Sequence, residues 1–158
     1  MNLAKEVGKT AREKGKTIAL AESITGGLVG SLMTDEPGAS DYFLASLVTY
    51  SNESKTKLLG VKGSTLRDHG AVSAQVAKEM ATGARLLTGS DIGAACTGIA
   101  GPDGGSKEEP VGLVYLAIDD GKKIRSEKRF FLGDRWAIKC QTAVRLLEMI
   151  RNSLKDIE

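Results

Sequence analysis

The stretch "LAESITGG", residues Leu20 to Gly27, joins an apolar run to a carboxylate, two hydroxyl side chains and two glycines. The apolar run predicts a buried strand, and the glycines predict a tight turn into a helix. Ser23 would then lie where a strand ends and a helix begins, the position of a nucleophilic serine in α/β hydrolases. The GxSxG spacing of that motif is missing, so a helix cap made by Ser23 or Thr25 is an equally supported interpretation.

Strand and helix patterns alternate around this stretch, which predicts a layered α/β fold. Apolar residues recur at helical spacing over 76–87, after the cap candidate Ser73, and over 143–154. The five segments with strand composition are 17–23, 45–50, 91–98, 111–119 and 124–132.

The first three of these strands are nearly continuous in apolar or small residues, so we expect them to be covered on both faces. The segment "DDGKK", residues 119–123, joins the last two strands and is too short for a crossover helix. A hairpin is therefore expected there, and the sheet should be mixed and mostly parallel.

The chain length of 158 residues suits one domain with a real core, and we expect a single domain over 1–158. The first 17 residues are polar and basic, and no stretch approaches the roughly 20 apolar residues of a membrane span. These features predict a cytoplasmic protein with no leader peptide and no membrane association.

Basic residues at positions 5, 9, 12 and 16 would share one face of an N-terminal helix, but the net charge is only +2. No aromatic residue interleaves with these charges, so a solvated face is favoured over a nucleic-acid site. Cys96 and Cys140 are far apart and His69 is the only histidine. We therefore expect reduced core cysteines, no metal site and no cofactor.

The segment "VTYSNESK", residues 48–55, supplies a candidate base for Ser23. Tyr50 and Lys55 would follow the second strand and could share one side of the next helical turn. A lysine acts as a base only when neutral, which requires a pKa lowered by desolvation or by a nearby cation. An exposed helix lysine is the simpler alternative.

Two other arrangements offer weaker candidates. His69 and Asp68 could form a triad with Ser23, although the polar turn around His69 favours a histidine that caps or packs. Ser54 and Lys57 match S-x-x-K, but the companion motifs S-D-N and K-T-G of penicillin-binding enzymes are missing.

The segment "CTGIAGPDGG", residues 96–105, follows a buried strand and contains four glycines. Long glycine-rich loops at the carboxyl ends of strands are common ligand sites in α/β sheets. Thr97, Gly98 and Gly101 are therefore candidates to contact a carboxamide, ribose or phosphate. A purely structural loop is the alternative.

The segment "GDRWAIK", residues 133–139, opens the last helix, with Asp134 as the expected cap. Arg135 would lie in the first turn, where the helix dipole disfavours a cation unless an anion balances it. A substrate phosphate would serve, and so would a surface salt bridge.

Six segments, taken in order over nearly the whole chain, resemble the CinA C-terminal domain family. They are "AESITGG", "VTYSNESK", "GAVS", "TGIAGPDGG", "PVGLVYLA" and "GDR". The resemblance implies a single three-layer α/β/α domain with a mixed sheet. It also implies an amidohydrolase that converts nicotinamide mononucleotide to nicotinate mononucleotide and ammonia, within NAD recycling and without a cofactor.

Carried over by motif, the resemblance assigns the nucleophile to Ser23 and its base to Lys55, acting directly or through Tyr50. Lys139 stands where many relatives have a second arginine, which weakens any role in phosphate binding. The substrate-binding residues expected are Glu22, Thr25, Gly26, Gly27, Thr97, Gly98, Gly101 and Arg135.

Two alternatives remain open: a nucleotide-binding module of the competence or damage-inducible type without turnover, and a Ser/Lys amidase for another small amide. The nucleotide-processing domain of longer family members is not expected here. The expected partners are the small-molecule substrate and a second copy of the chain, as a homo-oligomer.

Overall fold

The computed structural model of the chain describes residues 2–158. Its sheet contains β1 (Ile18–Glu22), β2 (Phe43–Val48), β3 (Ile92–Gly98), β4 (Leu113–Asp119) and β5 (Ile124–Phe130) in the spatial order β2-β1-β3-β4-β5. The helices are α1 (Leu3–Lys14), α2 (Leu28–Thr34), a short 3₁₀ helix η1 (Ala39–Asp41), α3 (Asn52–Leu59), α4 (Gly63–His69), α5 (Ala74–Thr88) and α6 (Arg135–Asp156).

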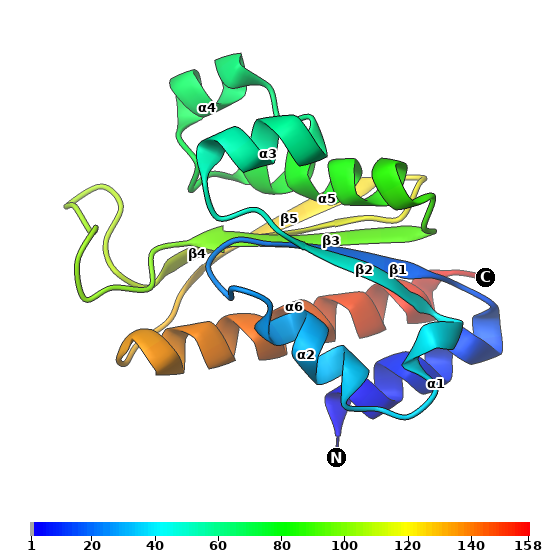
Figure 1. The fold of residues 1–158 in the computed structure, drawn as a ribbon. Coiled ribbons are helices and arrows are strands. Elements are labelled where there is room, and N and C mark those ends of the chain that lie inside the picture. The colour runs from blue at the N-terminus through cyan, green and yellow to red at the C-terminus, as the bar shows by residue number, and fades with distance from the viewer. Residues whose placement is uncertain (1) are drawn as a thin grey trace.

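The sheet lies between two helical layers, with α3, α4 and α5 on one face and α1, α2 and α6 on the other (Figure 1). β1 pairs in parallel with β2 and β3, whereas β4 runs antiparallel to both β3 and β5. Four strands thus run in one direction and β4 runs against them. The predicted α/β fold with a mixed five-stranded sheet is confirmed.

Alternate residues of the central strands build two separate cores. Ile18 and Leu20 of β1 belong to the cluster under α1, α2 and α6, whereas Ala19 and Ala21 belong to the cluster under α5. Small residues on the second face let α5 approach the sheet closely. A Cβ built on Gly93 would lie 2.0 Å from the backbone oxygen of Ala81 in α5, so only glycine fits there.

The predicted caps are confirmed. The Ser73 hydroxyl accepts from the backbone N–H of Val76 at the start of α5, and the Asp134 carboxylate accepts from that of Ala137 at the start of α6. The hairpin between β4 and β5 is confirmed as well.

Three expectations need correction. β1 and β3 are buried on both faces as predicted, but β2 is half-exposed because it forms one edge of the sheet. The segment around His69 is helix α4 rather than a polar turn. Cys96 is buried, whereas Cys140 is only partly buried on α6, and both are free thiols.

Within residues 2–158, the helices are too short or too polar to cross a lipid bilayer.

Candidate active site

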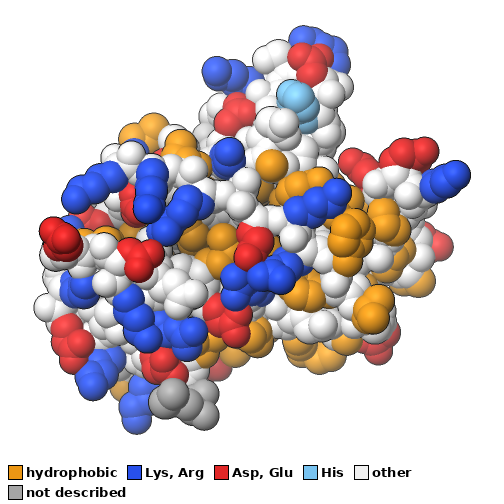
Figure 2. Space-filling view, turned by 180° about the vertical axis from the view of Figure 1, so that it is seen from behind, with side chains coloured by type: hydrophobic (Ala, Val, Ile, Leu, Met, Phe, Trp, Pro, Cys, Tyr) orange, Lys and Arg blue, Asp and Glu red, His pale blue; other side chains and the backbone are white. Residues whose placement is uncertain are grey.

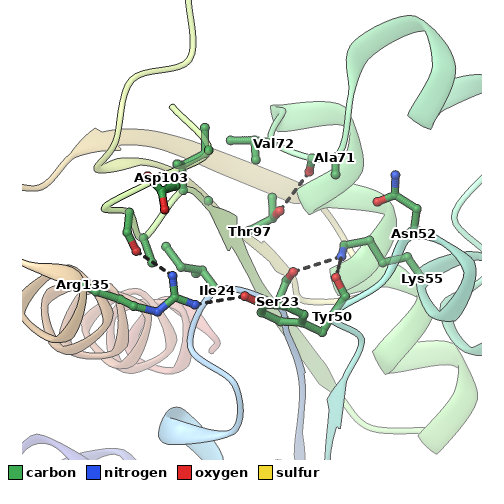
Figure 3. Close-up of a pocket in the computed structure, with 15 residues that line it drawn as sticks. Ser23, Ile24, Tyr50, Asn52, Lys55, Ala71, Val72, Thr97, Asp103 and Arg135 are labelled. Atoms are coloured by element: carbon green, nitrogen blue, oxygen red, sulfur yellow. Dashed lines mark hydrogen bonds between the residues drawn. The ribbon is translucent and has the colours of Figure 1, made fainter. Parts of the chain in front are cut away.

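A pocket of about 270 Å³ lies beyond the carboxyl ends of the three parallel strands (Figure 3). Ser23 follows β1, Lys55 follows β2 on the first turn of α3, and Thr97 is the second-last residue of β3. Parallel strands present their carboxyl ends at one edge of the sheet, which is where α/β proteins bind ligands. The lining residues are Ser23, Ile24, Tyr50, Asn52, Lys55, Ala71, Val72, Thr97, Gly98, Ile99, Ala100, Gly101, Asp103, Gly104 and Arg135.

Lys55 and Ser23 form a hydrogen-bonded pair at the base of this pocket. The Lys55 side chain is 1% exposed, and its Nζ lies 3.0 Å from Ser23 Oγ. The amine also donates to the backbone carbonyls of Thr49, at 2.7 Å, and Tyr50, at 3.2 Å. Ser23 is 8% exposed. The pairing predicted from two distant segments of the sequence is therefore present, and the alternative of an exposed helix lysine is excluded.

Burial lowers the pKa of Lys55 below its ordinary value of 10.5, because the ammonium form loses its hydration. A negative charge on Cys96 would oppose this change. However, burial raises the pKa of the Cys96 thiol to about 12, so Cys96 is uncharged at neutral pH. Desolvation is therefore the dominant effect, and it shifts the proton equilibrium of Lys55 toward the neutral amine.

The Tyr50 side chain does not lie between Lys55 and Ser23, so the predicted proton relay through its phenol needs correction. The phenol is 64% exposed, and its oxygen accepts from Arg135 Nη2 at 3.1 Å. Lys55 contacts the backbone carbonyl of Tyr50 and not the phenol. Since Lys55 reaches Ser23 directly, no relay is required.

Arg135 crosses one side of the pocket (Figure 3). Its Nη1 donates to the carbonyl of Gly101 at 2.7 Å, while Nη2 donates to Tyr50. The guanidinium thus ties the glycine-rich loop to the segment after β2. Guanidinium carries five N–H groups, so donors remain for an anion.

The glycine-rich loop forms the wall next to Arg135, and Thr97 precedes this loop. Thr97 Oγ1 donates to the carbonyl of Ala71 at 2.9 Å, which holds the segment before α5 against the pocket. A Cβ built on Gly98 would lie 2.7 Å from the Leu113 carbonyl, so glycine permits the close approach of β4. Thr97, Gly98 and Gly101 all line the pocket, as the sequence predicts.

Glu22 was expected to contact substrate, but the structure turns its carboxylate away from the pocket. The carboxylate is fully buried and accepts four hydrogen bonds. The donors are the hydroxyls of Thr25 and Ser46 and the backbone N–H groups of Val29 and Gly30. Thr25 is also buried and outside the pocket lining. Both residues therefore build the support beneath Ser23.

The same contacts correct the expectation for Gly26 and Gly27, which do not line the pocket. Both have positive φ, at 60° and 105°, and form the turn that leads from Ser23 into α2. The first amides of α2 are already used by the Glu22 carboxylate and by the carbonyl of Thr25. This helix end is consequently closed to an external anion.

The weaker candidates for a base lie elsewhere. His69 is exposed at the end of α4, outside the pocket lining. Lys57 pairs with Glu53 on the surface of α3, and the Ser54 hydroxyl donates to the carbonyl of Ser51. Neither pair is near Ser23, and Lys55 is the basic side chain that reaches it.

Asn52 and Asp103 line the pocket although the sequence analysis did not select them. Asn52 starts α3, three residues before Lys55, and Asp103 lies within the glycine-rich loop. Their positions inside two recognised motifs were the available signal. In the described part of the chain, no three His, Cys, Asp or Glu side chains are grouped as metal ligands would be.

We predict that Glu22→Gln lowers the free energy of unfolding by about 1–3 kcal/mol, because an amide offers one acceptor oxygen and turns an NH₂ group toward donors. Chemical denaturation measures the change. The matched control is Glu13→Gln, whose carboxylate lies in an exposed pair with Lys9 and should change stability by less than about 0.5 kcal/mol. Equal stability of the two variants would contradict the supporting role of Glu22.

Comparison with known proteins identifies the family. The model of the CinA C-terminal domain matches residues 1–154. A CinA-like protein from Geobacter sulfurreducens is 53% identical over 94% of this chain and 36% of its own length. A putative competence-damage inducible protein from Clostridium novyi is 46% identical over 98% of this chain and 37% of its own length. The chain therefore spans little more than a third of these curated relatives.

Solved structures agree with this result. A competence/damage inducible protein from Agrobacterium tumefaciens superimposes with a TM-score of 0.94 at 38% identity, covering 98% of this chain and 94% of that one. The competence damage-inducible protein A from Klebsiella pneumoniae superimposes with a TM-score of 0.95 at 29% identity, covering 99% and 97%. Because the family model matches residues 1–154 of the 158 in this chain, the chain belongs to the CinA C-terminal domain family.

Proposed function

We propose that the protein is a serine amidohydrolase that converts nicotinamide mononucleotide to nicotinate mononucleotide and ammonia. The observation that carries the proposal is the buried Lys55 amine, 3.0 Å from Ser23 Oγ at the base of a pocket. Among residues 2–158, no carboxylate forms an ion pair with this amine. A lysine held in this way is suited to accept a proton.

The hydrogen bonds of Lys55 support its role as the base. A neutral amine has two N–H groups and one lone pair. In the ammonium form all three N–H groups have acceptors, namely the carbonyls of Thr49 and Tyr50 and Ser23 Oγ. In the neutral form the two carbonyls can take both N–H groups, which leaves the lone pair for the Ser23 hydroxyl. The two carbonyls therefore orient the amine to accept the serine proton.

The reaction follows as two acyl transfers. Lys55 takes the proton of Ser23 as Oγ attacks the carboxamide carbon, and the Lys55 ammonium then returns that proton to the departing nitrogen, which leaves as ammonia. In the second half, Lys55 takes a proton from water, which attacks the ester carbon. The proton passes to Ser23 Oγ as the ester bond breaks, and the carboxylic acid product gives its remaining proton to solvent and leaves as the carboxylate.

The oxyanion of each tetrahedral intermediate needs N–H donors. The residues Ile24, Ala100 and Gly101 line the pocket, and their backbone N–H groups donate to no protein acceptor within residues 2–158. Ile24 directly follows the proposed nucleophile, which is a common source of an oxyanion donor. Each such donor contributes about 2.7–4 kcal/mol to transition-state stabilisation in comparable enzymes.

The substrate's phosphate is assigned to Arg135. A pocket of about 270 Å³ suits a nicotinamide ring with its ribose, leaving the phosphate toward the mouth where Arg135 lies. The free N–H groups of the guanidinium supply charge-assisted hydrogen bonds there. A Ser/Lys amidase acting on another small amide would use the same pair without needing this arginine.

The central test is ammonia release from nicotinamide mononucleotide by the purified protein and by Ser23→Ala. We expect Ser23→Ala to lose turnover while its free energy of unfolding changes by less than about 1 kcal/mol, because the remaining two acceptors of Lys55 are intact. No turnover by the wild-type protein would favour a nucleotide-binding module instead, and turnover by Ser23→Ala within tenfold of wild type would exclude Ser23 as the nucleophile.

The pH dependence tests Lys55. Only the neutral amine accepts a proton, and burial lowers its pKa, so kcat/KM should rise with pH and level off below the ordinary lysine pKa of 10.5. Lys55→Met should be inactive throughout the range. A wild-type profile that stays flat between about pH 6 and 9, with chemistry rate-limiting, would argue against Lys55 as the base.

The phosphate assignment is tested by comparing two substrates and two proteins. Arg135→Ala should lower kcat/KM for the mononucleotide about ten- to a hundredfold, because it removes charge-assisted hydrogen bonds. The corresponding riboside lacks the phosphate and should be hydrolysed almost equally by wild type and variant. An equal loss on both substrates would instead assign Arg135 to bracing Gly101 and Tyr50.

A further inference from the structure

We propose that Asp103 recognises the ribose of the substrate by accepting hydrogen bonds from its 2′- and 3′-hydroxyls, and so makes the pocket selective for ribonucleotides. Asp103 belongs to the glycine-rich loop and lines the candidate active site. This role rests on the proposed function, because the ribose is the part of the substrate that joins the ring with its amide at Ser23 to the phosphate at Arg135.

Close packing holds the turn that carries Asp103. A Cβ built on Gly101 would lie 2.5 Å from a methyl carbon of Val111, and one built on Gly105 would lie 2.9 Å from the other methyl carbon. The Gly101 carbonyl also accepts from Arg135 Nη1 at 2.7 Å. The loop therefore contacts the same valine on both sides of Asp103, and glycine permits that close approach. Asp103 is thus presented from a backbone that is held at both ends.

The Asp103 carboxylate is available to a ligand. The residue is exposed, and among residues 2–158 its carboxylate pairs with no lysine, arginine or histidine. An ionised carboxylate is only an acceptor, with two oxygens, whereas a vicinal diol offers two O–H donors. One bidentate contact can therefore satisfy both groups. In dinucleotide-binding α/β folds an acidic side chain likewise bonds a ribose hydroxyl.

The place of Asp103 along the pocket fits the ribose. Figure 3 shows it on the side of Arg135, whereas Asn52 lies at the other end, beside Lys55. A substrate with its amide at Ser23 and Lys55 and its phosphate at Arg135 spans the pocket between these ends. The ribose is the group next to the phosphate, so it lies toward Asp103. The nicotinamide ring lies toward Asn52.

The charge of Asp103 also decides which ligands are excluded. A carboxylate repels an anion, so Asp103 does not share the phosphate with Arg135, and hydroxyl donors are the groups that it can accept from. A phosphate on the 2′- or 3′-oxygen would bring like charges together, which costs affinity. The pocket should therefore bind a 5′-phosphate with an unmodified diol.

Another carboxylate between β3 and β4 offers a matched control. Figure 2, seen from behind, shows acidic side chains gathered where this loop projects from the molecule. Glu108 is exposed like Asp103 but does not line the pocket. Glu108→Gln therefore removes the same charge from the same loop and leaves the proposed ribose contact in place.

The test is binding of nicotinamide mononucleotide and of its 2′-deoxy analogue, measured by titration calorimetry on Ser23→Ala so that neither ligand is consumed. We expect the ribonucleotide to bind about ten- to a hundredfold more tightly than the deoxy analogue, as for one charge-assisted hydrogen bond. Adding Asp103→Ala should abolish this difference, whereas adding Glu108→Gln should preserve it. The two ligands are compared within each variant, so a general effect of the lost charge on the shared phosphate cancels.

Equal affinity for the two ligands before Asp103 is changed would overturn the assignment, and so would a preference that survives Asp103→Ala. An equal loss of preference in the Glu108→Gln variant would overturn it too. Ammonia release by the wild-type protein is a separate result. Turnover without a preference for the 2′-hydroxyl would support the proposed reaction and exclude the role of Asp103, whereas an Asp103-dependent preference without turnover would support only the binding site.

Discussion

The buried carboxylate of Glu22 is the contact on which the geometry of the pocket depends. Glu22 is the last residue of β1. Its carboxylate accepts hydrogen bonds from the Ser46 hydroxyl of β2 and from the backbone N–H groups of Val29 and Gly30 in α2. A buried carboxylate is costly unless each oxygen is hydrogen-bonded, and here the donors come from β2, from α2 and from Thr25 in the turn between β1 and α2. The turn that begins at Ser23 is thereby held between strand and helix, and these hydrogen bonds fix β1, β2 and α2 relative to one another.

Lys55 is also buried, but its charge is not balanced by the groups around it. Its partners are neutral oxygens, two carbonyls and one hydroxyl, so no carboxylate compensates for the hydration that the ammonium form loses. The buried Glu22 carboxylate and the buried Lys55 amine therefore have different roles. Glu22 is fully satisfied and supports the fold, whereas Lys55 retains a tendency to lose its proton, which is the property that the proposed reaction requires.

Arg135 connects the pocket to the outer surface of the molecule. Its position at the start of α6 is unfavourable for a cation with respect to the helix dipole, and its contacts with a carbonyl and a phenol oxygen only partly offset this. The adjacent Trp136 is exposed on the outside of the same helical turn. The proposed phosphate contact would use the N–H groups of the guanidinium that its bonds to Gly101 and Tyr50 leave free.

Local patterns in the sequence determined the strands, the caps at Ser73 and Asp134, and the hairpin, because each depends on residues close together in the chain. The meeting of Ser23 with Lys55 also followed from the sequence, since parallel strands bring their carboxyl ends to one edge. Only the tertiary structure decided that Glu22 faces α2 and that the Tyr50 phenol faces Arg135. The direction of such a side chain depends on donors and acceptors supplied by distant segments, which no local pattern encodes.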